Sequence, residues 1–262
     1  MIKLAFTTYM LPQFLSFDES LTLAKVSGCA GIDFRTGHMY AHGVELERTL
    51  DERKVMRRKL EDHYLEVASL NTGYKFDSKI AEERRDNIEG AKKTCQLAAD
   101  LGCDKVRVFG NDITYDNAQD CVAAVADAIG EIAGYASGLG VNVMLEMHGQ
   151  FNYWGYVLDV MRQVNQPNVG ILYNCDLRDL VNGSCIETFR RVEDHVMHIH
   201  MKDVTTGYPY VQLFEELLRI DYTGYLSAEL KETSDPTRVM QLHNVAVRQM
   251  LEVARRNIAL MG

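Results

Sequence analysis

The sequence predicts an α/β protein, a single (β/α)8 TIM barrel that spans residues 1–262 as one domain. Short apolar segments alternate with longer amphipathic segments along the whole chain, which is typical of a parallel barrel. The length of 262 residues is close to the roughly 250 that such a barrel needs. An open, doubly wound sheet is the competing architecture, but no glycine-rich phosphate loop follows the first strand.

Eight strands and eight helices are expected in strict alternation. The strands are predicted at residues 2–7, 30–35, 65–71, 105–109, 141–147, 168–174, 195–203 and 225–229. The helices are predicted at residues 18–27, 46–64, 80–101, 117–137, 155–164, 186–192, 210–220 and 236–259. Gly102 follows the third helix as a glycine C-cap would, and Gly138 and Gly140 follow the fourth. With four prolines and no Ser/Gly-rich linker, no domain boundary is expected.

Composition narrows the class of protein. A hydrophobic content of 47% with 25% charged residues is ordinary for a soluble globular chain. The net charge of -9 argues against a nucleic-acid groove, which usually needs a basic stripe. The six cysteines form no CxxC pair and are expected to be reduced, mostly buried thiols in a cytoplasmic protein. No apolar run approaches the roughly 18 residues of a membrane span.

The stretch 195–203 indicates where the chemistry lies. With a period of two, His198, His200 and Lys202 share one face, while apolar residues occupy the other face. Other predicted strands also end in polar ligand-type side chains: Glu146, Asn174, Asp176 and Glu229. Because active sites of such barrels lie at the C-terminal ends of the strands, these side chains are expected to converge. Carboxylate oxygens with one imidazole suit Mn2+ best, with Mg2+, Co2+ or Zn2+ as alternatives.

Further polar and aromatic residues are candidates for substrate binding: Arg107, His148, Lys202 and Trp154. Arg107 faces the barrel interior, where it either pairs with Glu146 or binds substrate. His148 lies just beyond Glu146, and Trp154 belongs to an aromatic top loop of the kind that stacks on sugars.

Histidines outside the strand ends receive other assignments. His198 lies one layer deeper than His200, and a supporting role is favoured over direct ligation. Four others are expected on the surface: His38, His42, His63 and His243. Asp33 and Arg35 share one face of the second strand.

Five segments together resemble the xylose isomerase-like TIM barrels, a family that includes sugar-phosphate isomerases, ketose 3-epimerases, inosose dehydratases and endonuclease IV. These segments are residues 105–110, 145–149, 169–176, 198–203 and 224–229, and the resemblance covers nearly the whole chain. In the family a metal is typically held by a Glu after strand five, an Asp after strand six, a His after strand seven and a Glu after strand eight.

Transferred position by position, the resemblance gives the metal ligands Glu146, Asn174, His200 and Glu229. The departure is at strand six, where Asn174 replaces the usual Asp, and Asp176 is the alternative ligand two residues later. The family's usual His shortly after that Asp is also absent, because Leu177 occupies its place.

By the same resemblance, Glu146 and Glu229 are the expected catalytic pair of a sugar isomerase or epimerase in carbohydrate metabolism. The alternative is a metal-dependent dehydratase or lyase that uses the same site, with His148 or Lys202 as the acid. An endonuclease and a barrel that binds a sugar without turnover are less favoured readings. The expected partner is a small sugar or polyol, with no nucleic acid and no membrane, and a homo-oligomer is left open.

Overall fold

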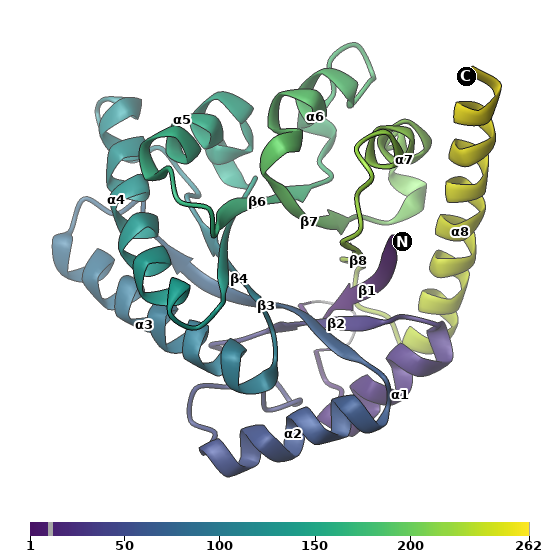
Figure 1. Cartoon of the computed structure of the whole chain (residues 1–262), viewed down its shortest axis with the longest axis horizontal. Coiled ribbons are helices and arrows are strands. Elements are labelled where there is room, and N and C mark those ends of the chain that lie inside the picture. The colour runs from purple at the N-terminus through teal and green to yellow at the C-terminus, as the bar shows by residue number, and fades with distance from the viewer. Residues whose placement is uncertain (10–12, 262) are drawn as a thin grey trace.

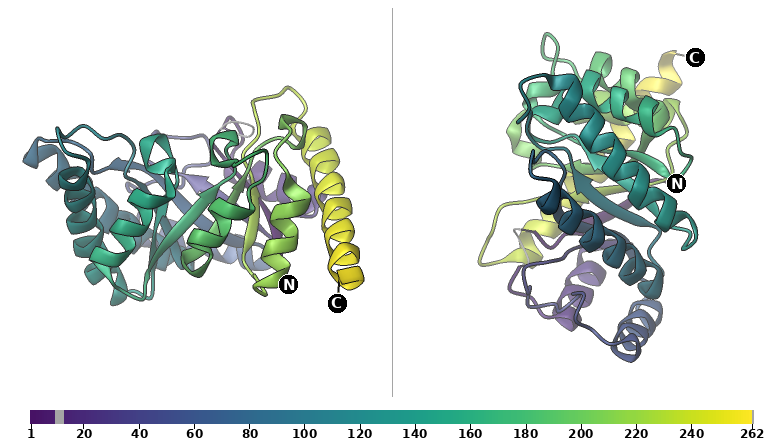
Figure 2. Two further views of the ribbon diagram at one scale, coloured as in Figure 1. Left: turned by 90° about the horizontal axis from the view of Figure 1, so that it is seen from above. Right: turned by 90° about the vertical axis from the view of Figure 1, so that its left-hand side faces the viewer.

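The computed structural model describes residues 1–9 and 13–261, and it contains a closed barrel of eight parallel strands. Figure 1 shows the strands as an inner ring and the helices outside it, and Figure 2 shows the same layers from two other sides. Each strand pairs with the next in sequence, and β8 pairs with β1 to close the barrel. The predicted (β/α)8 TIM barrel is therefore confirmed.

The strands are β1 Lys3–Thr7, β2 Gly31–Arg35, β3 Glu66–Lys75, β4 Lys105–Phe109, β5 Asn142–Glu146, β6 Val169–Asn174, β7 Val196–Met201 and β8 Tyr225–Ala228. The helices are α1 Phe17–Ser27, α2 Leu50–Asp62, α3 Ala81–Leu101, α4 Ala118–Ser137, α5 Trp154–Val164, α6 Ile186–Val192, α7 Tyr210–Arg219 and α8 Pro236–Met261. Short 3-10 turns follow three strands at Gly149–Asn152 (η1), Leu177–Asp179 (η2) and Val204–Thr206 (η4), and another, Glu193–His195 (η3), precedes β7.

Among the boundaries that differ from the sequence prediction, those of α2 and β3 have clear local features. The second helix begins at Leu50, not at residue 46, because Thr49 caps it and Glu52 completes the capping box. The third strand continues to Lys75, with an irregular register between Asn71 and Lys75. Gly102 ends α3 with a φ of 77°, as the glycine pattern predicted.

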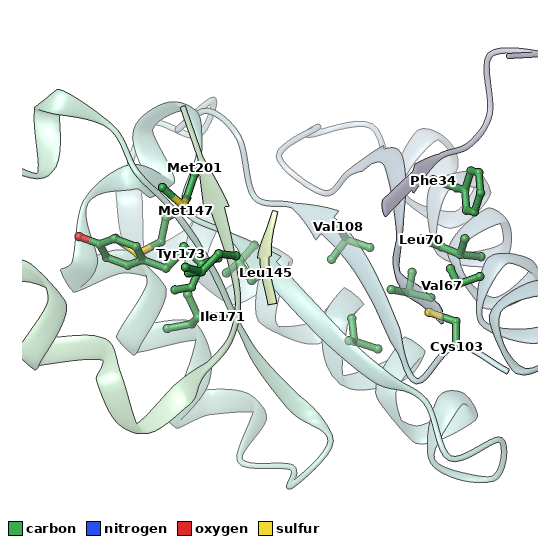
Figure 3. Close-up of a cluster of buried hydrophobic side chains, with 14 of the residues drawn as sticks. Phe34, Val67, Leu70, Cys103, Val108, Leu145, Met147, Ile171, Tyr173 and Met201 are labelled. Atoms are coloured by element: carbon green, nitrogen blue, oxygen red, sulfur yellow. The ribbon is translucent and has the colours of Figure 1, made fainter. Parts of the chain in front are cut away.

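The main hydrophobic core lies between the strand ring and the helices. Alternate strand residues supply it, and Figure 3 shows part of this layer, including Phe34, Leu70, Val108, Leu145 and Tyr173. Helix α8 packs against both α1 and α7, so the helical layer also closes where the two ends of the barrel meet (Figure 1). Because apolar residues point outward from the strands, the intervening residues point toward the barrel axis.

The inward-facing residues change in character along the length of the barrel. Ala5, Ala68 and Tyr225 form a small separate cluster near the start of their strands. Toward the C-terminal ends, the inward positions carry buried polar residues, among them Asp33, Arg107 and His200. This gradient places the polar chemistry at the end of the barrel where active sites of this fold are found.

The six cysteines are free and buried, as expected from their spacing. The prediction of surface positions is wrong for His42 and His243, which are 2% and 6% exposed. His42 stacks on Tyr40, and its two ring nitrogens lie 3.1 Å from the Thr8 hydroxyl and the Val44 amide. Across the described residues, no helix is both long and apolar enough to cross a membrane.

Candidate active site

Two histidines of β7 and one carboxylate of β2 meet inside the barrel. His198 Nε2 lies 2.8 Å from Asp33 Oδ2, and His200 Nε2 lies 3.1 Å from the same oxygen. All three side chains are buried, at 0%, 0% and 2% exposure for Asp33, His198 and His200. Their ligand atoms lie within 4.8 Å of one another, so this group could hold a metal ion. Asp33 therefore links strands that are not neighbours in the barrel wall.

The charge states of this trio follow from their mutual contact. Burial alone would raise the pKa of Asp33, but the two imidazoles hold that pKa far below its ordinary value. Burial lowers the pKa of His198, which therefore stays neutral at physiological pH. Since an ionised Asp33 can only accept, each imidazole donates through Nε2, and in a neutral ring Nδ1 then carries the lone pair. Both Nδ1 atoms are buried and have no hydrogen-bond partner.

Glu146, at the end of β5, lies between an amide and a guanidinium. Asn174 Nδ2 donates to Glu146 Oε1 at 3.0 Å, and Arg107 Nε lies 3.0 Å from Oε2. Arg107 also donates to the backbone carbonyl of Thr72 at 2.9 Å, and its guanidinium carbon is 3.9 Å from the centroid of the Phe109 ring. Burial lowers the pKa of Arg107 to about 10, while the nearby Glu146 opposes that change. Arg107 therefore neutralises Glu146 within the barrel.

Glu229 follows β8 directly and pairs with Lys202 of the neighbouring strand end. His200 Nδ1 lies 3.8 Å from Glu229 Oε2, so this ring nitrogen faces the carboxylate. Burial acts to raise the pKa of Glu229, but His200, Lys202 and Arg107 together hold it below its ordinary value. Glu229 is therefore ionised at neutral pH.

The side chains at the ends of β5 to β8 form a continuous arc of acceptors. Asn174 is hydrogen-bonded to Glu146 and is aligned in register with His200, which faces Glu229. Within this arc Asn174 Oδ1 and His200 Nδ1 are buried without hydrogen-bond partners, while Glu146 Oε2 has the Arg107 guanidinium 3.0 Å away. Carboxylate and amide oxygens together with an imidazole nitrogen are ligand types that a divalent cation takes, so the chemistry of these donors suits a metal. Among the described residues, the His, Cys, Asp and Glu side chains whose ligand atoms lie within 4.8 Å of one another are those of Asp33, His198 and His200.

Asp176 takes a different position from the arc. Both of its carboxylate oxygens bind Arg178: Oδ1 accepts from Nε at 3.0 Å and Oδ2 accepts from Nη2 at 2.7 Å. The side chain also caps η2 and accepts from the Arg178 amide. These hydrogen bonds with Arg178 lower the pKa of Asp176. Asp176 thus acts at the start of a turn, whereas Asn174 still belongs to β6.

The other residues predicted to bind substrate each contact a different neighbour. His148 Nδ1 lies 3.0 Å from Asn111 Oδ1, and its ring packs 4.8 Å from that of Phe109. Trp154 begins α5, where the Arg191 guanidinium carbon lies 4.2 Å from its ring centroid. Trp154 therefore packs against a side chain of α6, while Lys202 directly contacts Glu229.

Three buried residues to which the sequence analysis gave no functional role also line the site. Asp33, Arg35 and Asn71 are buried at the inward positions of β2 and β3. The available signal was the alternation in β2, where Asp33 and Arg35 are flanked by the buried apolar residues Ile32 and Phe34. Charged residues on the polar face of a barrel strand point inward, so both could have been placed in the interior.

Solved structures with the same architecture include several sugar epimerases and a dehydratase. An L-ribulose 3-epimerase superposes with a TM-score of 0.83 at 18% identity, covering 100% of this chain and 98% of its own. A D-psicose 3-epimerase from Clostridium cellulolyticum H10, solved with D-tagatose, gives 0.80 at 14%, covering 95% and 99%. The probable 3-DHS dehydratase AsbF from Bacillus anthracis gives 0.75 at 16%, covering 94% and 99%. At these identities the likeness establishes the fold alone.

No curated protein matches the sequence significantly. The family model described as "Xylose isomerase-like TIM barrel" matches residues 21–255, which is most of the chain. That match agrees with the closed barrel and with the polar strand ends. The chain therefore belongs to the xylose isomerase-like TIM barrel family.

Proposed function

We propose that this protein is a divalent-metal-dependent isomerase or epimerase of a small sugar or sugar-like α-hydroxy carbonyl compound. The main supporting observation is that Glu146, Asn174 and His200, three buried side chains of metal-ligand type, lie at the ends of β5 to β7 with the ionised Glu229 beside them. The sugar epimerases among the structural neighbours support the substrate class by analogy.

The proposed metal ligands are Glu146, Asn174, His200 and Glu229, with Mn2+ as the favoured ion. Asn174 is preferred to Asp176 because both oxygens of Asp176 are already bound by Arg178. Asp33 is assigned to orienting His200, since its hydrogen bond to Nε2 leaves Nδ1 free for ligation. When bound, the ion would polarise the substrate carbonyl and acidify the neighbouring C–H bond.

Proton transfer is assigned to Glu146 and Glu229. Glu146 ends β5 and Glu229 follows β8, so the two carboxylates come from separate positions of the strand ring. One carboxylate removes the proton next to the carbonyl, and the second, or the same one, returns a proton to the resulting enediolate. Arg107 and Lys202 hold the two carboxylates in place through the contacts described above. Isomerisation and epimerisation share this intermediate.

The test is exchange of a carbon-bound proton with solvent. Ketoses, aldoses and inososes are incubated with the Mn2+-loaded enzyme in deuterated water, and the product is analysed by NMR and mass spectrometry. We expect one deuterium at the carbon that changes configuration or oxidation level. Glu146→Gln and Glu229→Gln each remove a base with little change of volume, and we expect each to lower kcat by at least about 100-fold. Near wild-type turnover in either variant would remove that residue from proton transfer.

Elimination is the second candidate, and the contact between Lys202 and Glu229 favours it. An ammonium group beside the proposed base could protonate a leaving hydroxyl on the adjacent carbon. The same deuterium experiment separates the two outcomes, since elimination lowers the product mass by one water and isomerisation leaves it unchanged apart from label.

A further inference from the structure

Arg35 is a buried cation on the opposite side of the barrel from the acceptor arc. It ends β2 and is 7% exposed. Its Nη1 donates to the backbone carbonyl of Asn71 at 3.1 Å, while Nε is buried without a hydrogen-bond partner. The Tyr9 ring centroid lies 5.9 Å from the guanidinium carbon, and Arg35 acts to lower the pKa of Tyr40, which burial raises overall. None of these neighbours carries a negative charge.

Arg35 has no carboxylate within 4.0 Å among the described residues. Residues 10–12, which lie outside the described part of the chain, are Met-Leu-Pro and contain no carboxylate either. Arg107 is a useful comparison because it is equally buried, at 4% exposure, but has Glu146 at 3.0 Å. Burying a charge without a counter-ion costs free energy. Arg35 is therefore expected to bind an anion that another molecule supplies.

The surroundings of Arg35 form a wall of hydrogen-bond donors. Arg35 is aligned in register with Asn71 on β3, and Asn71 is aligned with Arg107 on β4. Ser69 donates to Asn71 Oδ1 at 3.0 Å, which leaves Asn71 Nδ2 as a second buried donor without a partner. Three neighbouring strands thus present donors at one level, whereas β5 to β8 present acceptors.

The backbone at Gly73 lies close to Arg35 and His38. A Cβ at position 73 would lie 3.2 Å from Arg35 Nη2 and 3.6 Å from His38 Nε2. Arg35 and His38 therefore both lie next to the position that a side chain at residue 73 would occupy. His38 is exposed at this rim, so the donor wall reaches from the interior to the surface.

We propose that the substrate carries an anionic group, a carboxylate or a phosphate, that Arg35 binds while its carbonyl end lies at the acceptor arc. This inference rests on the proposed function for the position of the reacting end, but not for the binding of the anion. Asn71 Nδ2 supplies a second hydrogen bond to the anion. A guanidinium is suited to either group because it can donate two parallel hydrogen bonds to it.

The experiment measures binding to metal-free protein by isothermal titration calorimetry, so that it does not depend on turnover. D-fructose is compared with D-fructuronate, in which C6 is a carboxylate, and with D-fructose 6-phosphate, in which the C6 hydroxyl carries a phosphate. We expect at least one anionic ligand to bind about 10- to 100-fold more tightly than D-fructose, the range of a charged hydrogen bond. The tighter of the two anions identifies the class.

Three variants locate the effect. Arg35→Met should abolish the preference for the anionic ligand, and Arg35→Lys should retain part of it because the charge remains. Arg53→Met is the matched control: Arg53 is also largely buried but pairs with Asp100 at 2.8 Å on the helical layer, and its loss should leave the preference intact. Equal binding of neutral and anionic ligands to the wild type, or an unchanged preference in Arg35→Met, would overturn the proposal.

A second measurement does not need a ligand of the right shape. Removing an uncompensated buried charge should leave the Tm of ligand-free Arg35→Met equal to or above that of the wild type. A fall of several degrees would instead assign Arg35 a structural role and contradict the inference. Anion binding without proton exchange would defeat the proposed function alone, and proton exchange on neutral sugars without anion preference would defeat this inference alone.

Discussion

The side-chain amide of Asn174 donates a hydrogen bond to Glu146 Oε1 at 3.0 Å, joining the ends of β6 and β5. The family pattern would place an Asp here, and a second carboxylate could not make this contact without repulsion. The amide therefore lets the two strand ends stay together while no cation is bound.

This contact predicts opposite effects of Asn174→Asp with and without metal. In metal-free protein, two carboxylates in contact should lower the Tm by about 2–6 °C. With saturating Mn2+, the added charge should tighten binding by about tenfold or more and restore the Tm. Differential scanning calorimetry in EDTA and in Mn2+ measures both effects. Asp176→Asn is the control and should leave metal affinity unchanged; loss of metal in that variant would move the ligand to Asp176.

Asp33→Asn tests how the buried trio works. If Asp33 orients His200, the variant should bind Mn2+ about 10- to 100-fold more weakly but keep the same stoichiometry. Elemental analysis and a metal titration of folded protein give affinity and stoichiometry separately. Complete loss of the ion in Asp33→Asn, together with full retention in Glu229→Gln, would instead assign the metal to Asp33, His198 and His200.

The buried histidines outside the site predict acid sensitivity. Burial lowers the pKa of His42 and of His243 to about 4 each, below the ordinary 6.5. Their neutral forms are retained in the fold, so the free energy of unfolding should be highest above pH 6.5 and fall as the pH drops toward 4. Each group contributes about 3 kcal/mol to that loss.

Urea denaturation at pH 8 and pH 4.5 checks this expectation. His42→Asn should be less stable than the wild type at pH 8, because a packed ring is lost. Its further loss on acidification should be smaller than that of the wild type. The same loss in both proteins would contradict the assignment to His42.

The loop after β5 predicts a strong dependence on Gly149. This residue has a φ of 60°, and a Cβ there would lie 2.4 Å from the Asn111 carbonyl oxygen. That carbonyl accepts from the Gln150 amide at 2.7 Å and so holds η1 beside His148. Gly149→Ala should therefore cost more than the roughly 1–2 kcal/mol of a left-handed alanine.

Gly183→Ala is the matched control, because Gly183 has a φ of 79° but nothing within 4 Å of the added Cβ. We expect the Tm of Gly149→Ala to fall clearly further than that of Gly183→Ala. Equal losses would mean that the loop adjusts to the added methyl group.

The barrel and its polar strand ends could be predicted from the sequence because both follow from alternation along single strands. The partners of the inward side chains could not be predicted in this way. Asp33 meets His198 and His200 across the barrel from a strand far away in the sequence, and no local pattern reports such a meeting. Asp176 lies two residues after Asn174, so strand alternation alone would place both on the same face. The capping box between Asp176 and Asp179 instead places Asp176 in the turn after the strand.

The contact of Asp33 with His198 joins residues 165 positions apart, and β1 pairs with β8 only after almost every other strand exists. A nascent chain that has left the ribosome only as far as β6 therefore contains Asp33 but lacks both histidines of the trio. The site is therefore assembled only when the barrel closes, and incomplete or truncated chains would not bind ions or sugars. If the proposed metal site is correct, metal uptake would report the moment at which the ring is complete, and it could serve as a direct probe of the final step of folding.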